Sequence, residues 1–504
     1  MIFGDTLRYW ARWQGDATAI RFGDRDVTWG ELNRSAGEIA AGLAARGIGQ
    51  GDRVGLVMSN RPEFLEVVAA CMQLGAIAAP FNLRFTAPEL AYVVGNADCA
   101  AVVTEATLVA GLSIARADKP TMLVLDADHG SLDALRVPGG TAPPVSIDPD
   151  DPLFICYTSG TTGDPKGAVL TNRSWFYASM CRALQGGINI HDRILLPFPL
   201  AFTGGLALGM VALFSGAMLV LEPAFEAGRA LHLIETQRIT VFMAVPTLFQ
   251  QMAQHPAFDS TDISSIRCAS SGGATVPVPL LQTYLQRGIT MTQTYSLTEV
   301  SASGITLPYH QAMERAGSCG VPAMHSEARI VDADDQPCPP GVVGEIVIRG
   351  PEVMAGYWRN PEASAAALRG GWCHTGDLGM MDADGYFSVV DRAKDMLISG
   401  GLNVYPAEIE RQLSTLPGVV ELAVIGVPDA RWGETPAVIA VCSGDGPTAS
   451  DVLAACAGVL ADFKTPRYLV VRPEPLPRNM SGKVLKAELR TQYADLPDHA
   501  TPIR

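Results

Sequence analysis

Short apolar stretches alternate with longer amphipathic ones along the first three quarters of the chain. The run RVGLVM at residues 53–58 has the length of a buried strand, and PEFLEVVAACMQLG at residues 62–75 has the length of a helix. Another strand-length run, AAVVTE, follows at residues 100–105. Because strands that alternate with helices are typical of parallel sheets covered by helices, this part is predicted to be α/β.

The pattern changes near Asp391, where a smaller α+β region is predicted to begin. Helices are expected at residues 406–416, with Pro406 in the first turn, and at residues 448–463, opened by a capping box between Thr448 and Asp451. Strands are expected at residues 420–427, 436–443 and 467–471. We therefore predict a large N-terminal domain of parallel sheets layered with helices over residues 1–391 and a small C-terminal α+β domain over residues 392–504.

One uncharged stretch, from Ile194 to Leu221, is long enough to cross a membrane. Several prolines and glycines interrupt it, and its end, GAMLVLEP, reads as a short buried strand that leads into a turn. The stretch is therefore predicted to be a loop, a buried helix and a core strand, and no transmembrane segment is expected.

Composition excludes several classes of function. The 504 residues are 48% hydrophobic and carry a formal net charge of −15, which argues against nucleic acid and anionic membranes as partners. The ten cysteines are scattered singly, so no metal site built on Cys or His is expected. The same pattern indicates that the protein occupies a reducing compartment. The first twenty residues lack the apolar core of a signal peptide, so we expect a cytoplasmic location.

The stretch YTSGTTGDPKG, residues 157–167, has the layout of a phosphate-binding loop. The apolar run at residues 153–156 leads into it, glycines permit close approach of the backbone, and Lys166 supplies a positive charge. The lysine lies between Pro165 and Gly167, so the spacing is not that of a Walker A loop. The residues expected to bind phosphate are Thr158, Ser159, Gly160, Thr161, Thr162, Gly163 and Lys166.

This loop resembles the signature loop of the adenylate-forming superfamily, which comprises acyl-CoA synthetases, carrier-domain adenylation enzymes and luciferases. Further motifs that resemble those of the superfamily follow in the same order, so that the likeness covers essentially the whole chain. They are PLAFTGG, SSGGATVP, YSLTE, GEIVIRGPEVMAGYW, HTGDLG, DRAKDMLISGGLNVYPAEIE and LPRNMSGKVLKAELR.

The resemblance implies a two-step reaction. A carboxylic acid first attacks the α-phosphate of ATP to give acyl-AMP and pyrophosphate, and the thiol of coenzyme A then displaces AMP. By resemblance, Lys483 bridges the carboxylate and the α-phosphate, Glu299 orders Mg²⁺ against the phosphates, and Thr298 contacts the α-phosphate. Positive charge and a metal ion are needed because two anions must meet.

The resemblance also assigns residues to the nucleoside. Tyr295 matches an aromatic residue that stacks on adenine, opposite the backbone of Gly272, Gly273 and Ala274. Asp377 matches the carboxylate that holds the ribose hydroxyls, and Arg392 reaches the ribose as well.

A mobile C-terminal domain explains how one site runs both steps. In the superfamily this domain rotates between the half-reactions, and Lys394 falls on the matching hinge position. Gly400 and Gly401 are then expected to face the tunnel that coenzyme A uses.

The acyl pocket is expected to include Phe202, Ser271 and Ser296. Phe202 stands where many relatives carry histidine, and Ser296 where glycine is commonest. Between Cys268 and Leu307 only Arg287 and Glu299 are ionised, so a neutral tail is expected, and a second carboxylate fits poorly because it would need a buried partner. Medium-chain fatty, aryl or alicyclic monocarboxylic acids fit this description.

Two alternatives to an AMP-forming acid–CoA ligase stay open. One is a stand-alone adenylating enzyme that loads a carrier protein, or a luciferase-like oxygenase. The other is a nucleotide-binding protein without catalytic activity. The expected partners are a small carboxylic acid, ATP and coenzyme A, with Mg²⁺ as cofactor, and a homodimer is left open.

Overall fold

The computed structural model describes all of residues 1–504 except residues 1, 129, 159–163, 275, 445 and 479–483. The chain divides into two compact units, residues 1–328 with 347–374, and residues 329–346 with 375–504. The functional boundary expected between residues 391 and 392 stays a prediction.

The largest sheet of the first unit has nine strands in the order β15-β14-β13-β12-β11-β9-β10-β1-β2. Its six central strands, from β13 to β1, are parallel, and the strands at both edges are antiparallel. The strands are β1 (Thr18–Phe22), β2 (Arg25–Thr28), β9 (Arg193–Leu196), β10 (Met218–Leu221), β11 (Val241–Ala244), β12 (Cys268–Gly272), β13 (Met291–Ser296), β14 (Gly304–Thr306) and β15 (Val321–Pro322).

A second sheet of seven strands has the order β18-β8-β7-β4-β3-β5-β6. Strands β7, β4, β3, β5 and β6 are parallel, whereas β8 and β18 continue the sheet in antiparallel pairs. The strands are β3 (Arg53–Val57), β4 (Ile77–Pro80), β5 (Ala101–Thr104), β6 (Leu123–Asp126), β7 (Pro152–Thr158), β8 (Lys166–Thr171) and β18 (Gly356–Tyr357).

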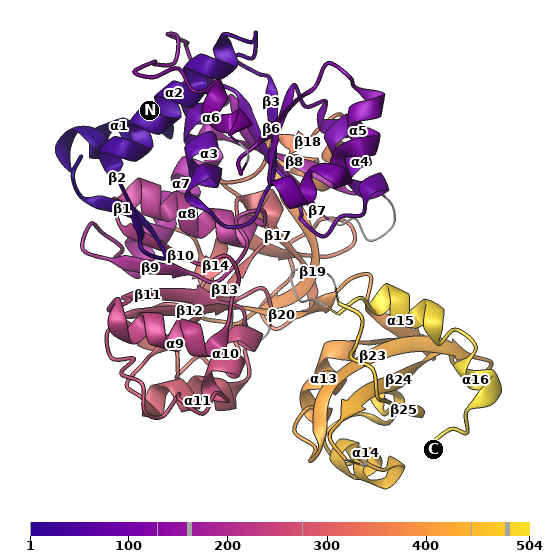
Figure 1. Ribbon diagram of the computed structural model, residues 1–504. Helices are drawn as coiled ribbons and strands as arrows, with labels where there is room; N and C mark the ends of the chain where they lie inside the picture. The colour runs from indigo at the N-terminus through magenta and orange to yellow at the C-terminus, as the bar shows by residue number, and fades with distance from the viewer. Residues whose placement is uncertain (1, 129, 159–163, 275, 445, 479–483) are drawn as a thin grey trace. The chain divides into compact units, whose positions relative to one another are not determined.

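Helices cover these two sheets. For example, α9, α10 and α11 lie against β11 and β12 (Figure 1) and share one apolar core with them. The helices are α1 (Gly4–Trp13), α2 (Trp29–Ala44), α3 (Pro62–Leu74), α4 (Ala87–Ala97), η1 (Ala106–Leu112), α5 (Ser113–Asp118), α6 (Ser131–Leu135), α7 (Asn172–Gly186), α8 (Thr203–Ser215), α9 (Ala227–Thr236), α10 (Pro246–Ala253), α11 (Val278–Gln286), η2 (Thr298–Val300), η3 (Tyr309–Gln311), α12 (Pro361–Ala367) and η4 (Arg369–Gly371).

Local sequence signals explain several of these boundaries. Helix α3 begins with Pro62, whose fixed φ suits a first turn, and ends before Gly75, which adopts a left-handed φ of 71°. The uncharged stretch from Ile194 to Leu221 forms a loop, α8 and β10, as predicted, and the end of β9 precedes the loop. Within the described part of the chain, no helix is both long enough and apolar enough to span a membrane.

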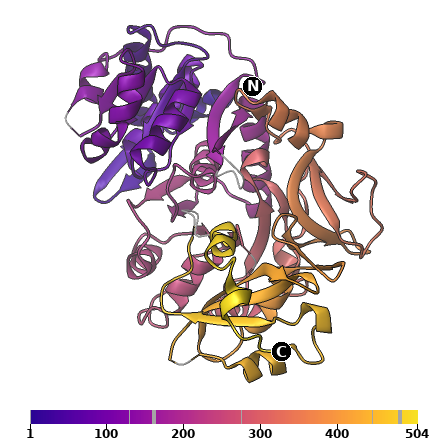
Figure 2. The ribbon, with the colours of Figure 1, turned by 90° about the vertical axis from the view of Figure 1, so that its right-hand side faces the viewer.

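The second unit carries the C-terminal sheet. It is part of the orange and yellow region of the ribbon (Figure 2). This sheet has the order β22-β21-β24-β23, and β25 pairs with β24. Its strands are β21 (Leu397–Ser399), β22 (Leu402–Val404), β23 (Val419–Asp429), β24 (Gly433–Cys442) and β25 (Tyr468–Arg472), and its helices are α13 (Pro406–Leu413), α14 (Ala449–Cys456), η5 (Asp462–Lys464), α15 (Lys486–Gln492) and α16 (Leu496–His499).

A further four-stranded sheet has the order β16-β17-β19-β20. Its strands are β16 (Glu327–Val331), β17 (Gly344–Arg349), β19 (Cys373–Met381) and β20 (Phe387–Arg392). Taken together, the layers of helices on mostly parallel sheets and the small C-terminal unit confirm the predicted fold class.

Helix α14 departs from the expectation in length. The capping box between Thr448 and Asp451 is present, but the helix ends at Cys456 instead of continuing to residue 463. Gly458 adopts a φ of 74°, which stops a right-handed helix, and η5 follows separately. The prediction missed this end because the apolar residues beyond it continue the helical pattern.

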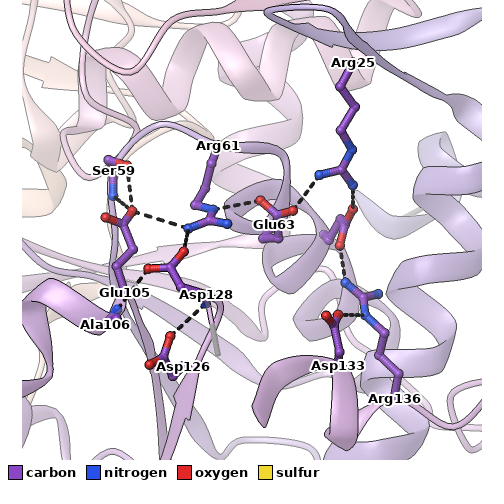
Figure 3. A network of polar contacts seen from close by, with 11 residues as sticks. Arg25, Ser59, Arg61, Glu63, Glu105, Ala106, Asp126, Asp128, Asp133 and Arg136 are labelled. Atoms are coloured by element: carbon purple, nitrogen blue, oxygen red, sulfur yellow. Dashed lines mark hydrogen bonds and ion pairs between the residues drawn. The ribbon is translucent and has the colours of Figure 1, made fainter. Parts of the chain in front are cut away.

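Ion pairs join several segments of the first unit in what we call the arginine network (Figure 3). Arg61 contacts Glu63 at 2.8 Å and Asp128 at 2.6 Å, and Arg25 contacts Glu63 at 2.6 Å. Glu66, which is only 2% exposed, contacts Arg136 at 2.6 Å. The network consists of Arg25, Arg61, Glu63, Glu66, Glu105, Asp128, Asp133 and Arg136.

Candidate active site

The predicted phosphate loop joins the antiparallel strands β7 and β8. Thr158 and Lys166 are Cα partners at the end of this strand pair, and the Thr158 hydroxyl donates to the Lys166 carbonyl at 3.3 Å. Lys166 is therefore held by a strand beside the loop. The remaining predicted members of the loop, Ser159, Gly160, Thr161, Thr162 and Gly163, lie outside the described residues.

Tyr357 connects two of the predicted site residues. The Lys166 Nζ lies 5.5 Å from the centre of its ring, which is the geometry of a cation–π contact. Its hydroxyl donates a hydrogen bond to Glu299 Oε1 at 2.8 Å. Burial, and then the charge of Glu299, raise the pKa of the Tyr357 hydroxyl, so it stays protonated and continues to donate.

Glu299 lies in η2, which follows β13 directly. Its backbone carbonyl accepts a hydrogen bond from the Met354 N–H at 2.8 Å, which fixes the turn. Among the described residues Oε2 has no hydrogen-bond or ion-pair partner, whereas Oε1 accepts from Tyr357. One carboxylate oxygen is therefore oriented and the other is available.

The neighbouring Thr298 is tied to the strand that leads into the loop. Its hydroxyl lies 2.9 Å from that of Thr203, at the start of α8. The Cys156 thiol, on β7, lies near Thr203, and this contact lowers the pKa of the thiol. Burial raises the pKa of Cys156 to about 12, although the contact with Thr203 opposes this, so the thiol stays protonated at neutral pH.

The residues predicted to contact adenine lie at the ends of neighbouring strands. Tyr295 is on β13 and is 9% exposed, and Gly272 ends β12. A Cβ at Gly272 would lie 2.6 Å from the carbonyl oxygen of Thr294, so only glycine fits. Gly273 has a φ of 80°, and Ala274 follows it at the surface.

The three residues predicted for the acyl pocket are spread over two strands and a helix. Ser271 and Ser296 lie on the adjacent strands β12 and β13, and Phe202 precedes α8. Ser271 is 1% exposed, and its hydroxyl has no hydrogen-bond partner among the described residues. Their roles stay predictions.

The residues predicted to hold the ribose belong to the second unit. Asp377 and Arg392 are Cα partners on β19 and β20, and Arg392 Nε lies 3.1 Å from Asp377 Oδ1. The Asp377 side chain is only 9% exposed. The neighbouring Asp391 accepts a hydrogen bond from the Ala407 N–H at 2.8 Å, in the first turn of α13.

The predicted hinge and CoA-tunnel residues also lie in the second unit. Arg490 donates to the Lys394 carbonyl at 3.3 Å and forms an ion pair with Asp395 at 3.2 Å. Gly400 and Gly401 form the turn between β21 and β22 with φ values of 60° and 82°. A Cβ at Gly400 would lie 2.7 Å from the Trp432 ring. Lys483 lies outside the described residues.

A magnesium ion fits the donor at Glu299. Within the described part of the chain, no group of three or more His, Cys, Asp or Glu side chains is arranged to hold a metal by itself. Mg²⁺, however, is commonly held by one or two carboxylates together with substrate phosphates. The available oxygen of Glu299 supplies such a carboxylate, and it lies near Lys166 through their shared contact with Tyr357.

Comparison with known proteins identifies the family. Residues 7–358 match the model of the AMP-binding enzymes, and residues 408–483 match that of the AMP-binding enzyme C-terminal domain. The chain therefore belongs to the AMP-binding enzyme family, and the predicted membership in the adenylate-forming superfamily is confirmed.

Relatives resemble the chain over nearly its whole length. A feruloyl-CoA synthase of Amycolatopsis is 40% identical, and the match covers 96% of this chain and 97% of the relative. The long-chain-fatty-acid–CoA ligase FadD13 of Mycobacterium tuberculosis is 37% identical over 94% of each. The structure of O-succinylbenzoate coenzyme A synthetase (MenE) from Bacillus subtilis in complex with ATP and magnesium ion matches with a TM-score of 0.86 and 31% identity, over 96% of this chain and 99% of that one.

Two residues of the site were not found from the sequence. Tyr357 lies within the motif GEIVIRGPEVMAGYW, but only the pairing of β18 with β8 brings it beside Lys166. Thr203 lies within PLAFTGG, directly after Phe202, which is the residue predicted for the acyl pocket. The motifs marked the right segments without showing which side chains meet.

Proposed function

We propose that the protein is an ATP-dependent, AMP-forming acid–CoA ligase that activates a monocarboxylic acid of the fatty, aryl or alicyclic type. The arrangement of Lys166, Tyr357 and Glu299 carries this proposal. It presents a cation and an oriented carboxylate side by side, next to the strands that hold the loop. The relatives named as feruloyl-CoA synthase and fatty acid–CoA ligase support the same reaction class.

The first half-reaction requires a carboxylate to approach a triphosphate. An oxygen of the acid attacks the α-phosphorus, the bond to the bridging oxygen of pyrophosphate breaks, and acyl-AMP and pyrophosphate result. Lys166 neutralises phosphate charge, and the available oxygen of Glu299 would hold Mg²⁺. The ion supplies further positive charge to the phosphates when bound.

The second half-reaction transfers the acyl group. The sulfur of coenzyme A bonds to the acyl carbon, the bond to the AMP oxygen breaks, and the thiol proton is released. We assign ribose binding to Asp377 and Arg392, the hinge to Lys394 and the pantetheine path to Gly400 and Gly401, on resemblance. A cytoplasmic location is likewise part of the proposal, because it rests on cysteine usage in the sequence.

A panel of carboxylic acids tests the proposed function. Fatty, aryl and alicyclic acids are incubated with ATP, Mg²⁺ and coenzyme A, and the release of AMP and acyl-CoA is measured. We expect both products in equal amounts with at least one class of acid. Acid-dependent pyrophosphate exchange without any thioester would instead favour an enzyme that loads a carrier protein, and no exchange with any acid would overturn catalysis altogether.

The variant Lys483→Ala tests the assignment of the catalytic lysine. Formation of acyl-AMP should fall by about a hundredfold to a thousandfold, because removing a preorganised charge costs about 3–4 kcal/mol of transition-state stabilisation. Thioester formation from supplied acyl-AMP should be spared. Equal loss in both half-reactions contradicts the role given to Lys483.

A further inference from the structure

A small polar cavity lies within the first unit between α7 and the strands β11 to β14. It has a volume of about 60 Å³, enough for a few water molecules or one substituent of a ligand. Most of the side chains that line it carry hydroxyl groups, and one carries a charge. They include Arg182, Ser270, Thr292, Thr294, Ser303 and Thr306.

The cavity opens on the same strands as the predicted nucleotide site. Ser270 pairs with Thr292 and Gly272 pairs with Thr294, so these positions share one face of the sheet. Gly272 is also a predicted adenine contact. Ser303 lies in the segment directly after η2, which carries Glu299. The cavity and the predicted nucleotide site thus share strands β12 and β13, which makes the cavity a candidate site for the far end of an acid whose carboxylate reacts near Glu299.

Arg182 is the charged group of the cavity, and one nitrogen of its guanidinium has no partner among the described residues. Nη2 donates to the carbonyl oxygen of Ala302. Nη1 is buried and has no hydrogen-bond partner in the described part of the chain, and no carboxylate there forms an ion pair with Arg182. Burial lowers the pKa of Arg182 to about 10, so the group is still charged at neutral pH.

Among the described side chains that line the cavity, Arg182 is the one charged donor. Thr292 donates to the Leu307 carbonyl, and Thr294 hydrogen-bonds the Ile305 carbonyl at 3.3 Å. The Thr292 hydrogen therefore points into the sheet, whereas the Thr294 hydroxyl also lies 3.2 Å from that of Thr306, and either of these two can donate. An oxygen acceptor that entered the cavity would satisfy Nη1, whereas an apolar group there would leave a buried charge without a partner.

A purely structural role explains only part of this arrangement. Ser301 and Ala302 adopt left-handed φ values of 53° and 54°, which is unfavourable for residues with a side chain. The bond from Nη2 to Ala302 stabilises that turn. It does not account for Nη1, because the turn makes no use of the second nitrogen.

We infer that Arg182 binds an oxygen acceptor, either a second carboxylate or a phenol or ether oxygen, at the end of the acid remote from the reacting carboxylate. This inference rests on the proposed function, since it requires an acid as substrate. It departs from the expectation of a neutral tail, because it places one polar group at the tip and because Arg182 supplies the buried partner that a second carboxylate would need. Arg182 is thus a specificity-determining residue. It lies on α7, which is outside all of the family motifs.

Matched acids test the inference. Cinnamate, 4-hydroxycinnamate, 4-methoxycinnamate and 4-carboxycinnamate share one skeleton and differ only at the far end, and hexanoate and adipate form an aliphatic pair. We expect kcat/KM of the wild-type protein to be at least tenfold higher for an acceptor-bearing acid than for its unsubstituted partner. A preference for the unsubstituted acid in both series would overturn the inference.

Variants of Arg182 then assign the preference. In Arg182→Met the ratio between acceptor-bearing and unsubstituted acids should fall to about one, mainly through KM, while the unsubstituted acid is still turned over. Arg182→Lys keeps a positive charge and should retain the preference for the acid that bears a second carboxylate. Arg182→Gln keeps hydrogen-bond donors but no charge, so the preference for the carboxylate should fall more than the preference for a phenol or ether. The matched control Arg173→Met removes an exposed arginine of the same helix and should leave the ratio unchanged.

The proposed function and the inference about Arg182 are contradicted by different results. If no acid yields AMP, the proposed function fails; if acids react but the ratio is the same in wild type and Arg182→Met, only the inference about Arg182 fails. Should Arg182→Met not fold because the Ala302 contact is lost, Ser303→Leu narrows the cavity and should lower the same ratio. Calorimetric binding of each acid to the wild-type protein and the variants gives a readout that does not depend on turnover, and identical affinities would contradict the inference.

Discussion

The arginine network and the candidate active site use buried charge in opposite ways. In the network, Arg61 contacts three carboxylates and Arg136 contacts two, so their charges are neutralised within the protein (Figure 3). In the active site, Glu299 keeps one oxygen available, and Arg182 keeps one nitrogen without a partner among the described residues.

The difference separates charges that stabilise the fold from charges that serve a ligand. Burying an ion without a partner is unfavourable by several kcal/mol, so a structural charge is expected to be paired in the free protein. A binding charge gains its partner only when the ligand arrives. Variants in the network should therefore change stability and spare activity, and variants in the site should do the reverse.

The largest effect is expected from Glu66→Gln in the network. It removes the buried partner of Arg136 and should lower the free energy of unfolding by about 3–5 kcal/mol, measured by urea denaturation. Activity well below the melting temperature should be retained. The control Asp262→Asn breaks an exposed pair with Arg238 and should cost less than about 1 kcal/mol, so equal losses would remove the distinction between the two pairs.

Glu299→Gln is the counterpart in the active site. An amide holds Mg²⁺ less well than a carboxylate, so acid-dependent pyrophosphate exchange should fall by hundreds-fold, equivalent to about 3–4 kcal/mol. The melting temperature should stay within about 2 °C of wild type. A large loss of stability together with full exchange activity would contradict the prediction that Glu299 serves the ligand and not the fold.

Tyr357→Phe should have an intermediate effect. It removes the hydrogen bond to Glu299 but retains the ring beside Lys166. Since a hydrogen bond to a charged group contributes about 1.5–3 kcal/mol, we expect a ten- to hundredfold loss of exchange rate and a higher Mg²⁺ requirement. Tyr9→Phe, at an exposed tyrosine, is the control and should show neither change.

The smallest effect is a pH dependence of stability in the network. Burial opposes ionisation of Glu63, but hydrogen bonds from Arg61 and Arg25 outweigh it and lower its pKa. A carboxyl whose pKa is lowered in the folded state stabilises the protein above its unfolded pKa, and this contribution is lost as the pH falls through the folded pKa. Between pH 7 and pH 3, the free energy of unfolding of Glu63→Gln should fall less steeply than that of wild type; parallel curves would exclude the contribution of Glu63.

Local patterns predicted the elements better than their ends. Helix α3 and strand β3 were found because their apolar runs are bounded by Pro62 and Gly75. The end of α14 was missed because Gly458 stops the helix while apolar residues continue. The order of the strands within the two large sheets could not be predicted from these patterns, because it depends on contacts between segments far apart in the sequence.

The candidate site shows the same limit. Motifs marked Lys166 and Glu299, since their residue types and surroundings are specific. Tyr357 and Arg182 are brought to the site by the pairing of β18 with β8 and by the packing of α7. A single sequence read by motif does not contain those contacts.

The protonation state of the buried Cys156 thiol bears on the proposed acyl-adenylate chemistry. Acyl-adenylates are electrophiles that modify nucleophilic side chains, and a thiolate is the form of cysteine that attacks. With a pKa of about 12, Cys156 is held almost entirely as the unreactive thiol. Cys156 is thus kept from competing with coenzyme A for the acyl group of the proposed intermediate.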